Sequence, residues 1–191
     1  MVGKNFSANN ISGKRKKSDF YETPYSMTRQ FLDDCSFYGD VLEPACGSGA
    51  IVKVLEEYGY ETHYFDIEVD FLKYQGSVCN IITNPPFSLA HEFILHAKKI
   101  ATRKIAMLLP LSYLHGKRRY DEIYCDELFP LSSVHVYTRY PLLGNDLRED
   151  GKYSTGMMVY AWFVFDVDHI GPPNIHWIDN NEYVLNSKDK L

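Results

Sequence analysis

The residues best suited to chemistry are four consecutive ones, Asn84, Pro85, Pro86 and Phe87. Two successive prolines lack N–H donors and fix φ, so they end a strand and hold a stiff backbone. The Asn84 side-chain oxygen and the Pro85 carbonyl can then point the same way, beside a free aromatic face. Two such acceptors can take both hydrogens of an exocyclic amine, such as that of adenine, and free its lone pair to attack. Phe87 would stack on the base, a contact worth roughly 1–3 kcal/mol.

A glycine turn precedes this tetrad, where Glu43 ends a short apolar stretch and Gly47 and Gly49 follow. Glycines allow a sharp turn and a close approach to a ligand. Val52 stands where a dinucleotide fingerprint would have its third glycine, so the pattern favours a different nucleoside cofactor. Asp66 ends the next predicted strand and is placed to accept the hydroxyl hydrogens of a ribose. Each feature alone also fits a tight turn or a solvated strand end.

Alternating strand and helix signals predict the elements that must position these residues. Strands are expected over residues 40–43, 62–66, 78–83, 105–111, 134–139 and 158–165. Helices are expected over residues 26–32, 51–58, 89–100 and 118–128. Such alternation predicts an open α/β sheet, whose ligands bind beyond the carboxyl ends of the strands. The glycine turn and the tetrad both fall at such ends.

Length and composition fit one globular domain, since the chain has 191 residues, of which 45% are hydrophobic and 24% charged. The domain is expected over residues 18–180, between a disordered basic tail at 1–17 and a polar tail at 181–191. No apolar run approaches the ~20 residues that span a bilayer, and the start lacks the apolar region of a secretory signal. We therefore expect a cytoplasmic protein without a membrane partner. The four cysteines form no CxxC pair and no ligand-like spacing with histidine, so no metal is expected.

The charge distribution points toward nucleic acid, although the net charge is -5. Residues 1–17 carry five basic side chains and no acid, and residues 98–119 carry seven basic side chains and no acid. Local patches of one sign create the field that a polyanion meets. Solvated surface lysines explain each patch equally well when it is taken alone.

The motifs together resemble those of class I S-adenosylmethionine-dependent methyltransferases, and within them the N6-adenine DNA methyltransferases. The similarity is greatest to small phage and prophage members, and it runs from about Asp19 to Asp166. It implies a Rossmann-like fold with a mostly parallel twisted sheet, an antiparallel C-terminal strand and helices on both faces. It implies S-adenosylmethionine as the cofactor and methyl transfer to N6 of adenine in DNA. The target adenine would be flipped out of the duplex. The catalytic residues would be Asn84, Pro85, Pro86 and Phe87.

The resemblance also assigns binding roles residue by residue. The Thr-Pro pair at residues 23–24 would contact the methionine part of the cofactor, and Asp70 would take its adenine amine. The full cofactor pocket would comprise Tyr21, Thr23, Pro24, Glu43, Ala45, Cys46, Gly47, Gly49, Asp66, Ile67, Asp70 and Phe71. The expected DNA-binding residues are Lys117, Arg118, Arg119, Arg139, Asn145 and Arg148.

The chain departs from the family pattern in two ways. Only three residues separate Asp66 from Asp70, so the second helix and third strand should be shortened or lost. This spacing leaves open which of Asp66, Glu68 and Asp70 binds the ribose. No separate recognition domain is present, and only the loop at 140–156 could read a DNA sequence. The recognition sequence, the oligomeric state and any link to a restriction nuclease do not follow from the sequence.

Two other functions remain open at this point. The same tetrad occurs in methyltransferases that act on RNA, at adenine N6 or guanine N2, and on glutamine in proteins. A non-catalytic nucleic-acid-binding module could also keep the fold. The basic segments favour nucleic acid over protein, the Thr-Pro pair favours adenine in DNA, and an intact Asn84 favours an enzyme.

Overall fold

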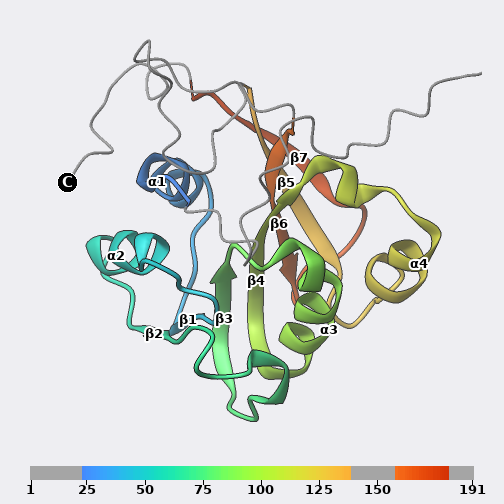
Figure 1. The fold of residues 1–191 in the computed structure, drawn as a ribbon. Helices are drawn as coiled ribbons and strands as arrows, with labels where there is room; N and C mark the ends of the chain where they lie inside the picture. The colour runs from blue at the N-terminus through green and yellow to red at the C-terminus, as the bar shows by residue number, and fades with distance from the viewer. Residues whose placement is uncertain (1–22, 139–157, 181–191) are drawn as a thin grey trace, which may run out of the picture.

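The computed structural model of the protein describes residues 23–138 and 158–180. Its helices are α1 (Tyr25–Asp34), α2 (Ala50–Glu57), α3 (Ala90–Ile100) and the short α4 (Lys117–Arg119) (Figure 1). Its strands are β1 (Val41–Glu43), β2 (Thr62–Tyr64), β3 (Val78–Thr83), β4 (Ala101–Pro110), β5 (Leu131–Tyr137), β6 (Tyr160–Asp166) and β7 (Asn174–Ile178). Single helical turns also occur at Phe71–Lys73, Phe87–Leu89, Leu111–Leu114 and Tyr120–Tyr124.

The strands described in residues 23–138 and 158–180 form one sheet in the order β2-β1-β3-β4-β6-β5-β7. β6 runs antiparallel to both of its neighbours, β4 and β5, and the other pairings are parallel. The expected mostly parallel sheet with an antiparallel strand near the C-terminus is therefore confirmed. β7 was not expected, and it adds a parallel edge strand beside β5.

The strand order reverses between β1 and β3. From β1 the chain passes to β2 on one side, and then returns to place β3 on the other side. In open α/β sheets, ligands bind in the crevice at such a reversal, beyond the carboxyl ends of the strands. The glycine turn follows β1 and the tetrad follows β3, so both border this crevice.

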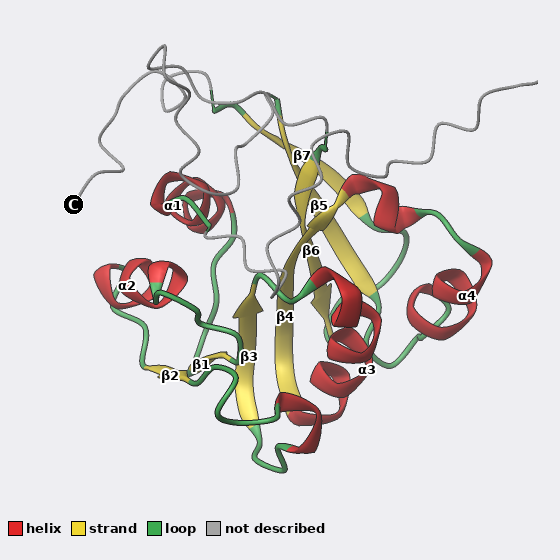
Figure 2. Ribbon diagram, in the orientation of Figure 1, coloured by secondary structure: helices red, strands yellow, loops and turns green. Residues whose placement is uncertain are grey.

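Helices cover both faces of the sheet, as expected (Figure 2). One apolar cluster packs α1 and α2 against the sheet, and the other packs α3 against the opposite face. β6 is buried on both faces, with Trp162 in the first cluster and Phe163 in the second, because successive side chains of a strand alternate. Phe31 of α1 stacks on Trp162 with ring centroids 4.6 Å apart. Among the helices described, none is both long and apolar enough to cross a bilayer.

The segment between β2 and β3 is short, as the spacing of its acids predicts. It contains only the single turn at Phe71–Lys73. This agrees with the expectation that the second helix and third strand of the family are shortened or lost. The helix expected over residues 118–128 is wrong in extent, since α4 passes into a π-helical turn at Tyr120–Tyr124. Beyond that turn the Asp126 carboxylate accepts the N–H groups of Leu128 and Phe129 and turns the chain toward β5.

Candidate active site

The glycine turn at the carboxyl end of β1 has the backbone shape that the sequence predicts. Gly47 and Gly49 have φ values of 51° and 82°, in the left-handed region that favours glycine. The Gly49 N–H donates to the Cys46 carbonyl at 2.7 Å, and Gly49 caps the start of α2. The Cys46 N–H donates to the Phe65 carbonyl at 3.1 Å. The turn is thereby joined to the residue that follows β2 and precedes Asp66.

Glu43 lies fully buried beneath this turn. Its Oε1 atom accepts a hydrogen bond from the Ala45 N–H at 2.9 Å and another from the Thr83 hydroxyl at 2.6 Å. Burial raises the pKa of Glu43 to about 8, and these two hydrogen bonds oppose the rise. Glu43 was expected to line the cofactor pocket, but its carboxyl group has no exposed surface. It instead shapes the turn and ties β1 to the residue before Asn84.

The tetrad leaves the carboxyl end of β3 and is held by the start of α1. The Asn84 Nδ2 atom donates to Thr23 Oγ1 at 3.0 Å, across 61 residues of sequence. Thr23 is buried, and Pro24 fixes the backbone immediately before α1. After Pro86, the Leu89 N–H donates to the Pro86 carbonyl at 2.9 Å, which forms the short turn that leads into α3. The Thr-Pro pair and the tetrad therefore belong to one site.

Phe87 packs against Tyr160, the first residue of β6. The two rings are stacked with centroids 5.6 Å apart and planes 24° apart. One face of Phe87 is thus covered, whereas the sequence predicts a ring standing clear at the rim. Tyr160 was not expected at the site. A signal for it exists, because an antiparallel strand brings its first residue to the edge where parallel strands end, and Tyr160 pairs with Pro110 at the end of β4.

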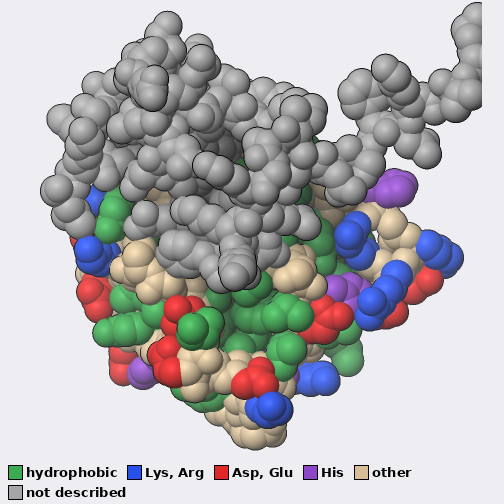
Figure 3. Space-filling model, in the orientation of Figure 1, with side chains coloured by type: hydrophobic (Ala, Val, Ile, Leu, Met, Phe, Trp, Pro, Cys, Tyr) green, Lys and Arg blue, Asp and Glu red, His purple; other side chains and the backbone are tan. Residues whose placement is uncertain are grey.

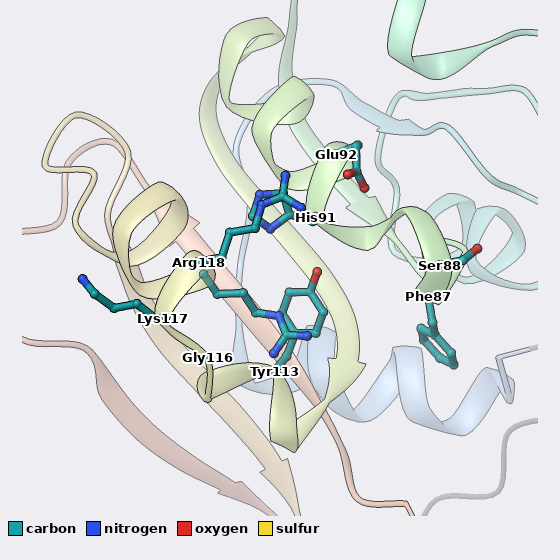
Figure 4. Close-up of a pocket in the computed structure, with 9 residues that line it drawn as sticks. Phe87, Ser88, His91, Glu92, Tyr113, Gly116, Lys117 and Arg118 are labelled. Carbon is teal, nitrogen blue, oxygen red and sulfur yellow. The ribbon is translucent and has the colours of Figure 1, made fainter. Parts of the chain in front are cut away.

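A pocket of about 400 Å³ lies beside Phe87, between α3 and α4 (Figure 4). The Arg119 guanidinium lies over the Tyr113 ring, 4.1 Å from its centroid, and Arg119 also donates to the His115 carbonyl. Figure 4 shows Lys117 directed away from the other labelled side chains. The lining residues are Phe87, Ser88, His91, Glu92, Tyr113, Gly116, Lys117, Arg118 and Arg119.

The basic segment at residues 117–119 is accompanied by acids that lie just beyond it. Lys117 pairs with Asp121 at 2.5 Å, and Arg118 pairs with Glu122 at 3.1 Å. Lysine and arginine side chains gather around α4 on the face shown in Figure 3, with acidic side chains among them. Within the described residues, Arg119 pairs with no acid. Exposed pairs of this kind contribute little to stability, so the cations can exchange partners.

The buried His91 of this region also faces an acid of the π-helical turn at Tyr120–Tyr124. His91 Nε2 lies 2.6 Å from Glu122 Oε2, and these contacts with His91 and Arg118 lower the pKa of Glu122. Lys98, earlier in the basic run, is almost fully buried and donates to Asp126 at 2.9 Å and to the Ile123 carbonyl at 2.8 Å. Lys98 therefore anchors the π-helical turn onto α3 and does not add to an exposed patch.

Asp66 is an acid that follows β2 and borders the glycine turn. It is half-buried directly after Phe65, whose carbonyl accepts from the Cys46 N–H. The backbone N–H of Asp66 donates to Glu68 Oε1 at 3.0 Å, which places Glu68 in a local turn. Ile67, expected to pack on the cofactor, has 95% of its surface exposed. These positions leave Asp66 and Ile67 at the surface bordering the turn.

Asp70 and Phe71 take part in local structure. The Asp70 carboxylate accepts the Leu72 N–H at 3.2 Å and pairs with Lys73 at 2.8 Å, so it caps the short turn at Phe71–Lys73. Phe71 is buried and packs on Phe93 of α3 with ring centroids 4.7 Å apart. The placement gives Phe71 a core contact in addition to any contact with a cofactor. Tyr21, Arg139, Asn145 and Arg148 lie outside the described residues.

Comparison with known proteins identifies the fold. No family model matches the sequence, and no curated protein matches it. A candidate class I S-adenosylmethionine-dependent methyltransferase from Listeria monocytogenes is similar in structure, with a TM-score of 0.57 and 13% identity over 86% of this chain and 67% of that one. A candidate RNA methyltransferase from Pyrococcus horikoshii gives a TM-score of 0.54 and 16% identity over 81% of this chain and 90% of that one.

A third similar structure is the M protein of the type I restriction enzyme EcoKI. It gives a TM-score of 0.54 and 12% identity over 83% of this chain. This chain spans only 46% of the length of that M protein. Identities this low establish a shared architecture. The protein therefore has the Rossmann-like fold of the class I S-adenosylmethionine-dependent methyltransferases.

Proposed function

We propose that this protein transfers a methyl group from S-adenosylmethionine to the N6 amine of adenine in DNA. The observation that carries the proposal is the hydrogen bond from Asn84 Nδ2 to Thr23 Oγ1 at 3.0 Å. It joins the Thr-Pro pair, which favours adenine in DNA, to the tetrad that would hold the amine. Both motifs meet where the strand order reverses, which is the ligand crevice of open α/β sheets.

The glycine turn and its neighbours suit S-adenosylmethionine. A Cβ placed on Gly49 would meet no described atom within 4 Å, so the turn leaves room beside the start of α2. Thr23 and Pro24 would hold the methionine end, and Asp66 would accept hydroxyl hydrogens of the ribose. Glu43 would contribute from beneath by fixing the shape of the turn. When bound, the cofactor supplies a methyl group that its sulfonium already activates.

Asn84 and Pro85 would prepare the amine for attack. The Asn84 amide nitrogen is directed to Thr23, so the side-chain oxygen is the acceptor that this amide offers to a substrate. The Pro85 carbonyl would take the second amine hydrogen. With both hydrogens held, the nitrogen lone pair is released from the ring and directed at the methyl group. Acceptors that are fixed before the substrate arrives need no reorganisation during the reaction, which is how such sites lower the barrier.

The pocket beside Phe87 supports a nucleic-acid substrate. A base in a duplex cannot reach an enclosed site and must be flipped out of the stack. Phe87, fixed by Tyr160, offers an aromatic edge to a flipped base, and the Arg119–Tyr113 pair adds a planar cation next to it. The EcoKI M protein, an N6-adenine DNA methyltransferase, supports DNA, and the candidate RNA methyltransferase makes RNA the competing substrate.

A direct test incubates the purified protein with S-adenosylmethionine and, separately, duplex DNA, single-stranded DNA and RNA. Each nucleic acid is then digested to nucleosides and analysed by mass spectrometry. N6-methyladenine formed in the DNA samples is the expected result. Methylated nucleosides found only in RNA, or none in any sample, would overturn the proposed substrate.

Asn84→Ala is the matched control for this assay. The variant should abolish transfer and leave the affinity for S-adenosylmethionine within a few fold, because Asn84 would contact the amine and not the cofactor. Isothermal titration calorimetry measures that affinity. Equal loss of transfer and of cofactor binding would mean that Asn84 holds the cofactor instead.

A further inference from the structure

Three side chains that are distant in sequence meet on the α1 face of the sheet, away from the tetrad. Asp34 ends α1, His135 lies in β5, and His176 lies in the edge strand β7. The Asp34 Oδ2 atom is 2.6 Å from His135 Nδ1 and 3.8 Å from His176 Nδ1. One ligand atom from each of the three residues lies within 4.8 Å of the other two. We propose that Asp34, His135 and His176 form a binding site for a divalent transition-metal ion such as Zn²⁺.

The ligand types suit this class of ion. Two imidazole nitrogens and one carboxylate oxygen are common ligands of Zn²⁺, with bonds of about 2.0–2.2 Å. Tetrahedral bonds of that length place ligand atoms roughly 3.3 Å apart. The observed separations of 2.6 Å and 3.8 Å from Asp34 lie on either side of that value. These two distances therefore differ from the spacing around a bound ion by less than about 1 Å each, and water would complete the shell.

The His135 ring is fixed in position by burial and by contacts on both sides. Its side chain is only 3% exposed, and its ring and that of Phe31 pack edge to face with centroids 5.3 Å apart. Its second nitrogen, Nε2, lies 2.9 Å from the Ser133 hydroxyl. On binding, the ring proton moves from Nδ1 to Nε2 and is donated to Ser133, a second partner of the kind that orients metal-bound histidines.

His176 is the movable ligand of the three. Its side chain is 44% exposed and its ring stacks on that of His135, with centroids 4.6 Å apart and planes 14° apart. Lone pairs of two parallel rings do not converge on one ion. The His176 ring must therefore turn out of the stack, which its exposed position on the edge strand allows.

A metal at this site would fasten α1 to the far edge of the sheet. Without an ion, α1 already contacts β5 through the Tyr137 hydroxyl, which donates to the Met27 carbonyl at 2.6 Å. α1 begins two residues after Thr23, the residue that binds Asn84. The ion would thus stabilise the helix whose start positions the tetrad, and this inference does not depend on the substrate.

The test uses the full-length chain without an affinity tag, after removal of metals by chelation and dialysis. Calorimetric titration with ZnCl₂ should show one saturable site. Zn²⁺ should also raise the Tm of the protein by several degrees. His176→Ala and Asp34→Asn should weaken binding to this site by at least about tenfold. His176 is exposed, so its variant should fold, and circular dichroism checks this.

His63→Ala is the matched control. His63 is also an exposed histidine beside an aspartate, with Nε2 3.6 Å from Asp40, but among residues 23–138 and 158–180 it belongs to no group of three ligands. Its replacement should leave Zn²⁺ affinity and the rise in Tm unchanged. The proposal is overturned by absence of Zn²⁺ binding to the natural protein. Equal affinities for the natural protein and His176→Ala would overturn it as well.

Discussion

Glu43→Gln isolates the effect of the buried carboxyl group that joins the glycine turn to β3. Glutamine has nearly the same shape and keeps a side-chain oxygen for the Ala45 N–H and the Thr83 hydroxyl, which lie 2.9 Å and 2.6 Å from Glu43 Oε1. It cannot ionise. The substitution therefore removes one titrating group while leaving the two hydrogen bonds possible.

The size of the effect follows from the pKa of Glu43 in the two states. Burial raises it to about 8 in the folded chain, and a glutamate in an unfolded chain titrates near 4.3 (about the model-peptide value). Between these values the folded state holds a proton that the unfolded state has lost. The free energy of unfolding then falls by about 1.4 kcal/mol for each pH unit. The contribution is complete below the unfolded pKa and is lost as the pH rises through about 8.

Urea unfolding at pH 5, 6 and 7 measures this contribution in the natural protein and in Glu43→Gln. The other titrating groups are the same in both proteins, so they cancel in the difference between them. Between pH 5 and pH 7 the variant should gain about 3 kcal/mol of stability relative to the natural protein. Two unfolding free energies that change in parallel with pH would refute the reasoning, because Glu43 would then be ionised in the folded state.

Three further predictions test other contacts of the structure. Thr23→Val removes the acceptor of the Asn84 amide and should lower kcat roughly tenfold, with Thr23→Ser restoring it in the same kinetic assay. Tyr137→Phe deprives the Trp162 indole N–H and the Met27 carbonyl of their shared partner, so urea unfolding should show a loss of about 1–3 kcal/mol. Arg119→Ala should weaken DNA binding and reduce its salt dependence by about one phosphate contact. Lys117→Ala removes an equal charge, but that charge is already paired with Asp121, so both the affinity for DNA and its salt dependence should change less. Equal losses in the last pair would contradict the difference in their surroundings.

The fold could be predicted because its signals are local. β3 is an apolar run at residues 78–83, and the structure has a strand over the same six residues. The glycine turn is likewise a local feature, since the positive φ values of Gly47 and Gly49 favour one residue type. β7 was missed, although Ile175 and Trp177 alternate with polar Asn174 and His176, because the alternation is short and four of the five residues are exposed. Its position is determined by pairing with β5.

The contacts that complete the site depend on residues far apart in the chain. Thr23 and Asn84 were each expected to act, but the hydrogen bond between them depends on where α1 crosses the sheet. Tyr160 reaches Phe87 because β6 runs antiparallel to β4. Asp34, His135 and His176 are too far apart in the sequence for their spacing to indicate that they lie together. A search for closely spaced ligands therefore predicts no metal site.

The basic run at residues 98–119 shows why charge counted along a sequence differs from charge in space. The run contains no acid, yet acids follow immediately at Asp121, Glu122 and Asp126. One turn of helix brings residue i+4 beside residue i, so Lys117 and Arg118 meet the first two of these acids. Lys98 meets the third from α3. The positive field expected from the run is therefore reduced wherever a pair forms, and the pocket beside Tyr113 draws its unpaired positive charge mainly from Arg119.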